Sequence, residues 1–308
     1  MTSTDDAQPD TKRLRRSTLN WDIAAVLSEE VTAVTLPLAE GLAVEIHEKR
    51  SISKIIKLFD NPFPHKFIKR VNATARDKAL VLYDFCLPNN DDRAKQKAQL
   101  ELKLAASDVD ANAVTVVTVK VPTRAPLTRA QFDWARSTWP VHFYQDKEVE
   151  ALLAKTTPEI WPVRERHGGH MQTAMESHPP RVGAVAVSGS GEGQEVIVAT
   201  ADPSHPLKHA CMVLVDTVAR TQGGGAWGRG AKCHIEDSSS SSYLLTGCDV
   251  YVSHEPCIMC AMALVHSRIR RLFFCHPTSQ GACQTLIKMN TVSDMNHSYQ
   301  VFKMTMTR

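Results

Sequence analysis

The sequence predicts an α/β protein of two domains, and three observations support this prediction. The chain has 308 residues, whereas a single hydrophobic core usually stops growing at about 250–300 residues. From about residue 21 onward, the spacing of apolar residues changes repeatedly between the period of a strand and that of a helix. A strand–helix–strand pattern covers residues 249–275. The composition, 43% hydrophobic and 22% charged, is that of a folded globular protein.

Residues 1–20 are predicted to form a disordered basic tail. They are polar and contain the cluster Lys12-Arg13-Leu14-Arg15-Arg16 outside any periodic pattern. A solvated tail is one interpretation, and a nuclear-localisation signal or an arm that contacts phosphates is the other. We therefore expect the protein in the nucleus, in the cytoplasm or in both.

The sequence predicts neither a membrane partner nor a secreted protein. No run approaches the roughly 20 apolar residues that cross a bilayer, and the polar start lacks the apolar stretch of a secretory signal. Eight cysteines in so long a chain favour free thiols or metal ligands over a disulfide framework. The net charge of +3 neither demands nor excludes a nucleic acid.

Residues 21–122 are predicted to form an N-terminal α+β domain. Runs of β-branched and apolar residues predict its strands. One helix is predicted from isoleucines that share one helical face, and the other from acidic residues placed in its first turn. The elements follow the order strand, helix, strand, strand, helix, strand, which is typical of a ferredoxin-like, split βαβ domain. The predicted elements are Val31–Leu36, Ser51–Phe59, Phe67–Val71, Ala79–Cys86, Asp91–Ala106 and Ala113–Val121.

Basic residues recur in this domain and make it a candidate for binding RNA. Lys66, Lys69 and Arg70 lie beside Phe63 and Phe67. Phosphate charge together with aromatic stacking holds single-stranded or looped RNA, although the two phenylalanines are equally consistent with an ordinary core. The lysines of the second helix are more simply explained as a solvated face.

Residues 123–165 are predicted to be a connector with one short helix, Arg129–Ser137, and residues 166–308 a second domain. Arg181–Ser188 and Glu195–Ala201 are β-rich runs on either side of a glycine-rich turn, so a hairpin is expected. Residues 221–242 are rich in glycine and serine and predict a mobile insertion.

His209, Cys257 and Cys260 are the candidate metal ligands. His209 precedes a helical run, and Pro256-Cys257-Ile258-Met259-Cys260 is predicted to begin another helix. A helix that starts at Pro256 presents both thiolates in its first turn, so that they reach one ion, and its N-terminus favours the thiolate form. No second Cys-x-x-Cys completes a zinc ribbon. The pattern predicts Zn²⁺ bound by one imidazole and two sulfurs.

One residue of the zinc deaminase signature is replaced in this chain. His-x-Glu…Pro-Cys-x-x-Cys uses the glutamate to move protons, but Cys211 stands two positions after His209. A thiol stays largely protonated at neutral pH and reaches less far than a glutamate. We predict no catalytic residue in this chain, and we expect a structural role for Glu255, which precedes the Pro-Cys turn.

The block VYVSHEPCIMCAMALVHSRIRRLFF closely resembles the tRNA adenosine deaminases of the cytidine/deoxycytidylate deaminase superfamily. The resemblance covers roughly Val182–Arg308 and implies a cytidine-deaminase-like three-layer α/β/α domain with His209, Cys257 and Cys260 as zinc ligands. The vacant acid position at Cys211 and the N-terminal extension resemble the non-catalytic subunit of the eukaryotic heterodimeric enzyme. That subunit implies a partner with an intact His-Ala-Glu motif and adenosine-to-inosine conversion at tRNA wobble position 34.

Two other functions remain open from the sequence. The chain could be a self-sufficient zinc-dependent nucleic-acid deaminase, or a zinc-stabilised RNA-binding protein without a link to deamination. Arg268, near the end of the ligand helix, is a candidate RNA contact; together with Arg270 and Arg271 it could equally belong to a solvated helix end.

Overall fold

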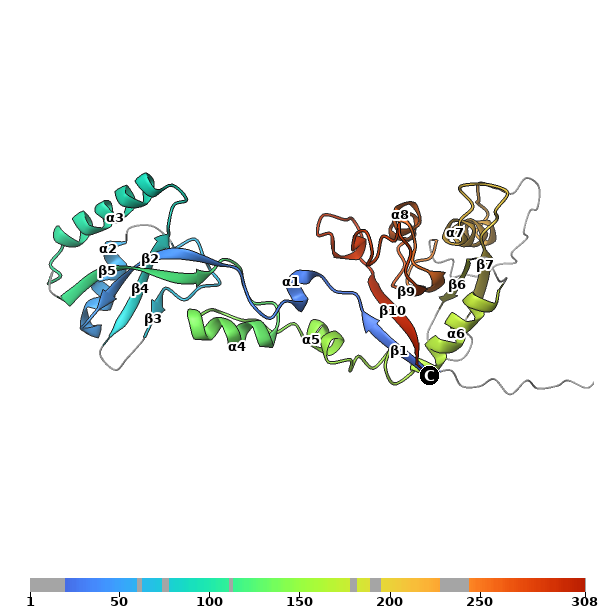
Figure 1. Cartoon of the computed structure of the whole chain (residues 1–308), viewed down its shortest axis with the longest axis horizontal. Coiled ribbons are helices and arrows are strands. Elements are labelled where there is room, and N and C mark those ends of the chain that lie inside the picture. Colours follow the sequence, from blue (N-terminus) through green and yellow to red (C-terminus); the bar gives the residue numbers. More distant parts are fainter. Residues whose placement is uncertain are drawn as a thin grey trace, which may run out of the picture. The chain divides into compact units, whose positions relative to one another are not determined.

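The computed structural model describes residues 20–59, 63–73, 78–110, 113–177, 182–188, 195–227 and 244–307. The chain divides into two compact units (Figure 1): unit 1 contains residues 1–26 and 155–308, and unit 2 contains residues 27–154. The predicted tail therefore lies outside the described residues, except for residue 20. Of the predicted mobile insertion, residues 228–242 also lie outside them.

Unit 1 is built on a six-stranded sheet of the order β1-β10-β9-β8-β6-β7. Strand β8 pairs in parallel with β9, and β9 with β10, whereas β6 and β7 form the predicted antiparallel hairpin. The strands are β1 (Asn20–Ala25), β6 (Gly183–Ser188), β7 (Glu195–Thr200), β8 (Asp249–His254), β9 (Arg271–His276) and β10 (Gln300–Thr307).

Helices cover both faces of this sheet. One face packs against α7 (Ala210–Thr221) and α8 (Ile258–His266), because alternate strand residues such as Val250 and Val252 join a core with Leu214 and Leu264. The opposite face packs against α6 (Arg164–Glu176), where His167 stacks on Phe273 at 4.7 Å between ring centroids. The predicted three-layer α/β/α arrangement is therefore present.

Strand β1 corrects the predicted domain boundary. Residues 21–122 were expected to form one domain, but β1 pairs antiparallel with β10 and belongs to unit 1. A β-carbon on Gly168 of α6 would lie 2.3 Å from the Trp21 ring, so this helix can approach β1 only without a side chain there. The pairing joins segments almost 300 residues apart, and no local pattern reveals such a contact.

Unit 2 contains a four-stranded antiparallel sheet of the order β3-β4-β2-β5. Its main elements follow the predicted order strand, helix, strand, strand, helix, strand, and each helix connects strands that have one other strand between them, as in a split βαβ unit. These elements are β2 (Leu38–Ile46), α2 (Ile52–Leu58), β3 (Val71–Asn72), β4 (Ala79–Phe85), α3 (Asn90–Ala105) and β5 (Val114–Pro122).

Two predicted strands of this unit are wrong. Val31–Leu36 contains no strand, because the Ser28 hydroxyl accepts a hydrogen bond from the N–H of Val31 and caps the short helix α1 (Glu29–Thr32). The first strand is β2 instead. Within Phe67–Val71, only the last residue lies in a strand, whereas Ile68 forms an isolated bridge with Val141.

The connector predicted for residues 123–165 is not a separate segment. Its first part carries α4 (Arg129–Thr138), close to the predicted helix, and α5 (Lys147–Leu153), and it belongs to unit 2. Residues from Lys155 onward belong to unit 1, eleven residues before the predicted start of the second domain. In the part of the chain that the structure describes, no helix combines the length and the hydropathy of a membrane span.

Candidate metal centre

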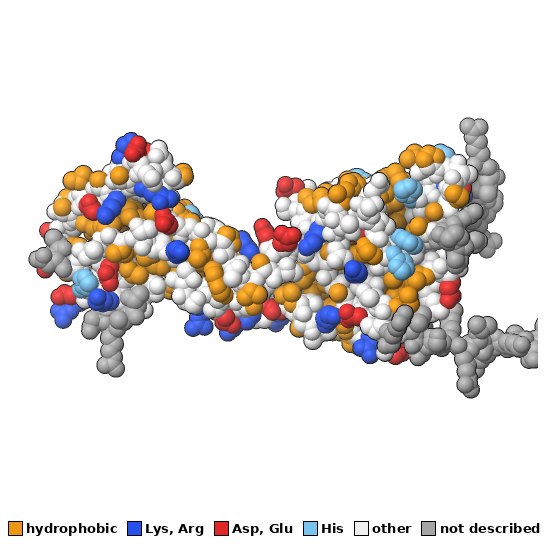
Figure 2. Space-filling model, viewed as in Figure 1, with side chains coloured by type: hydrophobic (Ala, Val, Ile, Leu, Met, Phe, Trp, Pro, Cys, Tyr) orange, Lys and Arg blue, Asp and Glu red, His pale blue; other side chains and the backbone are white. Residues whose placement is uncertain are grey.

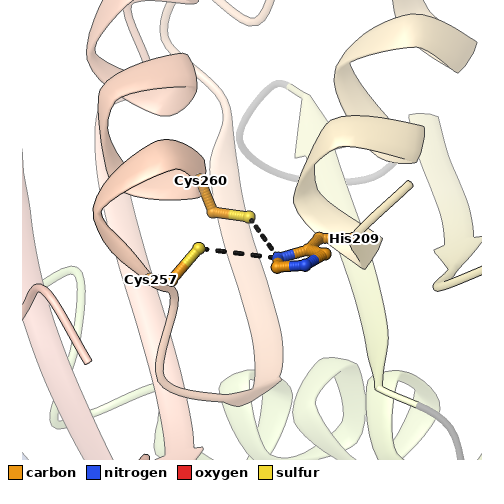
Figure 3. Close-up of side chains that lie close together, drawn as sticks. All are labelled: His209, Cys257 and Cys260. Carbon is orange, nitrogen blue, oxygen red and sulfur yellow. Dashed lines mark hydrogen bonds between the residues drawn. The ribbon is translucent and has the colours of Figure 1, made fainter. Parts of the chain in front are cut away.

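The three predicted ligands meet where two helices begin (Figure 3). His209 is the residue before α7, Cys257 is the residue before α8, and Cys260 lies in the first turn of α8. Helix α8 thus starts two residues later than predicted, at Ile258 rather than at Pro256. The His209 Nδ1 atom lies 3.5 Å from the Cys257 sulfur and 3.6 Å from the Cys260 sulfur.

These distances fit a tetrahedral ion. With Zn–N of about 2.0–2.1 Å and Zn–S of about 2.3 Å, tetrahedral angles place nitrogen and sulfur about 3.5 Å apart. The candidate ligand atoms of the three side chains all lie within 4.8 Å of one another. One imidazole and two sulfurs are also a donor set that zinc prefers. The residues present therefore fit a zinc ion.

The protein around the sulfurs opposes their ionisation in the absence of a cation. Burial raises the pKa of the Cys257 thiol. The pKa of the Cys260 thiol is raised first by its hydrogen bond with Cys211 and then by burial. A bound divalent cation reverses this preference, because a coordinating thiol is deprotonated.

Cys211 occupies the position of the missing acid, and its side chain is only 2% exposed. It lies in the hydrophobic core of unit 1 with Cys260 and Tyr299. A pocket of about 300 Å³ borders Cys211 and the three candidate ligands, and Thr278, Ser279 and Gln280 line its other side. The only carboxylate among the described residues that line this pocket is that of Glu255.

Glu255 does not replace the missing acid, because hydrogen bonds occupy its carboxylate. The side chain is 3% exposed and accepts hydrogen bonds from the backbone N–H groups of Cys283, Gln284 and Thr285 at 3.0, 2.6 and 2.9 Å. Burial alone would raise the pKa of Glu255, but these bonds and one from the Thr285 hydroxyl together lower it. The expected structural role agrees with this environment.

The four tentative RNA contacts have different surroundings. Lys66 and Lys69 are exposed, and no ion pair joins either of them to another described residue. Arg70 is half-buried; its guanidinium lies over the rings of Phe59 and Phe63 at 5.1 and 5.2 Å, and burial lowers its pKa. Arg70 thus packs within the unit.

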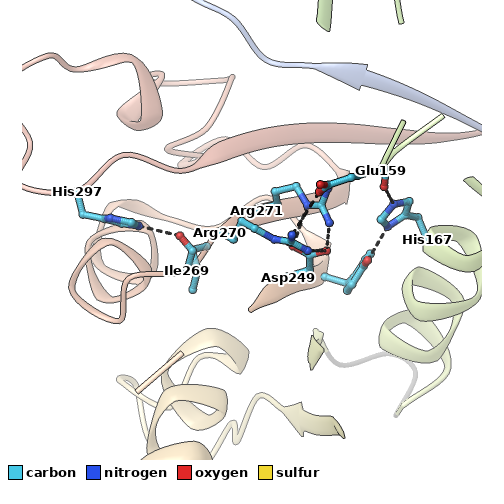
Figure 4. Close-up of polar contacts among 8 residues, drawn as sticks. Glu159, His167, Asp249, Ile269, Arg270, Arg271 and His297 are labelled. Atoms are coloured by element: carbon cyan, nitrogen blue, oxygen red, sulfur yellow. Dashed lines mark hydrogen bonds and ion pairs between the residues drawn. The ribbon is translucent and has the colours of Figure 1, made fainter. Parts of the chain in front are cut away.

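Arg268 is exposed and has a positive φ of 56° just after α8. Arg270 and Arg271, which follow it in the sequence, form an ion-pair network around the buried Asp249 that the sequence analysis missed (Figure 4). Arg271, 5% exposed, donates to both oxygens of Asp249 at 2.8 and 2.5 Å, and Arg270 donates to the same carboxylate. Both arginines also contact Glu159. The interpretation as a solvated helix end is therefore wrong for the buried Arg271, whereas Arg270 is exposed but paired with acidic residues.

Comparisons with known proteins match both the deaminase region and most of the chain. Residues 168–276 match the family described as "Cytidine and deoxycytidylate deaminase zinc-binding region". A Mus musculus protein called "Probable inactive tRNA-specific adenosine deaminase-like protein 3" is 33% identical over an alignment that covers 92% of this chain and 89% of the mouse protein. The chain belongs to this protein 3 family. The Homo sapiens member is 34% identical with the same coverage of both chains.

The chain also matches proteins of lower sequence identity. The "tRNA-specific adenosine deaminase subunit tad3" of Schizosaccharomyces pombe is 29% identical, over 59% of this chain and 57% of its own length. A solved structure from "Biochemical and Structural Studies of A-to-I Editing by tRNA:A34 Deaminases at the Wobble Position of Transfer RNA" matches 44% of this chain and 91% of its own. Its sequence identity is 24% and its TM-score is 0.30.

Proposed function

We propose that this chain is the catalytically inactive subunit of a heterodimeric tRNA adenosine deaminase. One observation carries the proposal: an intact His209–Cys257–Cys260 cluster combined with the buried thiol of Cys211, where the zinc deaminase signature has a glutamate. The name of the mouse and human relatives, "Probable inactive", supports the loss of activity, and the name "subunit" of the fission yeast relative supports a multichain enzyme.

The cluster is proposed to hold a structural zinc ion. In an active zinc deaminase, the ion at this position activates a water molecule as a Lewis acid. In this chain, His209 and the two thiolates hold the ion, but no carboxylate among the described residues at the pocket is free to move a proton. The loss of a general acid or base costs about 10²–10⁴-fold in rate. The ion then stabilises the fold that the partner requires, since metal binding is coupled to folding.

The substrate is proposed to be tRNA, with adenosine converted to inosine at the wobble position by the partner. The relatives' names support a tRNA substrate. Unit 2 is the candidate for holding the tRNA, and the exposed Lys66 and Lys69 are its candidate phosphate contacts, because unpaired lysines are available to a polyanion. We expect the enzyme in the nucleus, in the cytoplasm or in both.

The partner is proposed to be a catalytic chain with an intact His-Ala-Glu motif. The proposed surface for it lies beside the candidate metal centre, where exposed apolar side chains occur at the start of α8 and in the loop that packs on this helix. These side chains are Ile258, Leu286, Ile287 and Val292, between 39% and 62% exposed. Apolar side chains also reach the surface around α7 and α8 in the view of Figure 2. Exposed apolar patches commonly mark protein interfaces.

The proposal is tested by an inosine assay on full-length tRNA that carries either adenosine or guanosine at position 34. The purified chain alone should form no inosine. Adding a deaminase chain with the intact motif should produce inosine only in the adenosine-34 tRNA. Turnover by the pure chain alone would overturn the proposal in favour of a self-sufficient deaminase. Failure of every such deaminase chain to form a complex would favour a zinc-stabilised RNA-binding protein.

A further inference from the structure

Glu255 connects the metal centre to the loop of residues 278–285, called here the clamp loop. This residue lies between the end of β8 and Cys257. Its backbone is anchored at one end of the loop, because the N–H of Glu255 donates to the His276 carbonyl at 2.7 Å and the Thr278 hydroxyl donates to the Glu255 carbonyl at 3.1 Å. Its side chain reaches the other end of the same loop.

The carboxylate of Glu255 gathers five hydrogen-bond donors from the clamp loop. The N–H groups of residues 283–285 all point at Oε1, and the Thr285 hydroxyl donates to Oε2 at 2.5 Å. A longer bond of 3.4 Å comes from the N–H of Thr278. No lysine or arginine of the described residues forms an ion pair with this carboxylate. Its buried charge is stabilised entirely by donors of one loop, so the loop's conformation depends on it.

The clamp loop in turn holds the segment that carries the thiolate of Cys257. Gly281 forms a backbone bridge with Cys257, and the N–H of Ala282 donates to the carbonyl of Pro256 at 2.7 Å. The contact is tight, since a β-carbon on Gly281 would lie 2.1 Å from the carboxyl carbon of Glu255. The same loop forms one wall of the pocket at the three candidate ligands.

We propose that Glu255 is a positioning residue for zinc: by holding the clamp loop against Pro256 and Cys257, it fixes the Cys257 sulfur toward His209. The carboxylate does not contact the ion; it orients a residue that does, as groups hydrogen-bonded behind metal ligands commonly do. This inference rests on the zinc ion proposed above but not on the tRNA substrate or on the partner chain.

The test measures zinc release from the full-length chain to a chromogenic chelator, together with thermal unfolding. Glu255→Gln keeps the size of the side chain, but it removes the negative charge and replaces one accepting oxygen by an NH2 group, which cannot accept hydrogen bonds. Loss of a residue behind a metal ligand costs about 10–100-fold in metal affinity, and we expect zinc affinity to fall within that range. In the cobalt-substituted protein, the absorption bands from sulfur-to-metal charge transfer should also change.

Tyr251→Phe is the matched control. It removes the hydrogen bond between Tyr251 and His167 on the opposite face of the same sheet, and it should lower the unfolding temperature without changing zinc affinity. Thr285→Val is a milder variant that removes only the hydroxyl donor; it should weaken zinc binding less than Glu255→Gln, and it carries the test if Glu255→Gln does not fold.

The outcomes separate this inference from the proposed function. Wild-type protein that contains no zinc would overturn both. A zinc-loaded wild type, with Glu255→Gln and Thr285→Val both retaining its zinc affinity and cobalt spectrum, would overturn only the role of Glu255. Equal losses of zinc affinity in Tyr251→Phe and Thr285→Val would also overturn it, because the effect would then follow general stability.

Discussion

Strand β8 has a buried carboxylate at each end, and the protein stabilises the two charges in different ways. Asp249, its first residue, pairs with Arg270 and Arg271, which also contact Glu159. Glu255, directly after its last residue, receives only uncharged donors from the clamp loop. Both acids are at least nine-tenths buried, and neither is available to move a proton.

The comparison shows that the partners of an acidic residue, rather than its type, decide its role. At the Asp249 end, an ion pair joins Glu159, which precedes α6, to Arg271 at the start of β9. At the Glu255 end, hydrogen bonds hold the clamp loop against the candidate metal centre. The two arrangements should also fail differently. A buried charge that depends mainly on one buried charged partner loses most of its stabilisation with that partner, whereas a charge shared among several N–H donors tolerates the loss of one donor.

The largest effect is expected from Arg271→Met. This change leaves Asp249 buried beside a partly exposed Arg270, and breaking a buried ion pair typically costs about 3–5 kcal/mol. Denaturant unfolding of the full-length chain, monitored by circular dichroism, measures the loss in the transition of unit 1. Arg268→Met is the control, because that side chain is exposed and should change stability by no more than about 0.5 kcal/mol. Equal effects of the two substitutions would contradict the role assigned to the network.

Zinc removal should have the next largest effect, at the other end of the strand. A ligand present at 100–1000 times its dissociation constant stabilises the folded state by about 2.7–4.1 kcal/mol. Chelation, or Cys257→Ser together with Cys260→Ser, should therefore lower the unfolding temperature of unit 1 by about 5–16 °C. Unit 2 contains no member of the cluster and should keep its own transition. An unchanged transition of unit 1 would contradict a structural metal.

Acid should destabilise the helical layer that covers the Asp249 end. Burial lowers the pKa of His167, whose ordinary value is about 6.5, so folding favours the neutral ring. The stability from this neutral ring is complete above the unfolded-state pKa and is lost as the pH falls below it toward the folded-state pKa. Stability measured from pH 7 to pH 5 should therefore fall less steeply in His167→Gln than in wild type.

The contacts of His167 explain this preference. Its Nε2 lies 2.9 Å from the Glu159 carbonyl, which only accepts, so Nε2 carries the hydrogen and Nδ1 accepts from the Tyr251 hydroxyl at 2.6 Å. A glutamine can make the same two bonds without titrating. His266→Gln is the control, since His266 is exposed at the end of α8. Identical pH profiles for wild type and His167→Gln would refute the role of this histidine.

The smallest effect is expected from Cys211→Ala. The thiol fills a small volume in the core of unit 1, and its loss should cost about 1 kcal/mol, comparable with one buried methylene. Inosine formation by the complex with the catalytic partner should stay within about twofold of wild type, because the partner supplies the proton-transfer group. A much larger fall in turnover, at unchanged stability and complex formation, would show that Cys211 takes part in the reaction.

The candidate zinc ligands could be recognised in the sequence, whereas the hydrogen bonds behind them could not, for a physical reason. His209 and the Cys-x-x-Cys pair lie where the local sequence predicts helix starts, and histidine and cysteine at this spacing are typical metal ligands. The donors to Glu255 are mainly backbone N–H groups of residues 283–285, which no residue type reveals. The vacant acid position at Cys211 could be recognised only because the His-x-Glu…Pro-Cys-x-x-Cys signature around it is specific.

Long-range pairing limited the prediction of the fold in the same way. The element order of unit 2 follows from local periodicity, yet Val31–Leu36 was mistaken for a strand, because β-branched content outweighed the cap at Ser28. The amide of Gln131 donates to the carbonyls of Glu30 and Ala33, each at 2.6 Å, and so fixes this segment from about 100 residues away. Asp249 and Arg271 likewise meet only through the parallel pairing of β8 and β9.

The antiparallel pairing of β1 with β10 has a consequence for synthesis on the ribosome. Residues 20–25 are made long before residues 302–307, which are their strand partner in the part of the chain that the structure describes, so this edge of the sheet stays open until β10 has been translated. All of unit 2 is made in the interval and contains its own core. Because closure of so long a loop is slow, we expect the complete sheet to form late in folding, and a product that stops short of residue 300 would leave β1 without its strand partner and β9 with an unpaired edge.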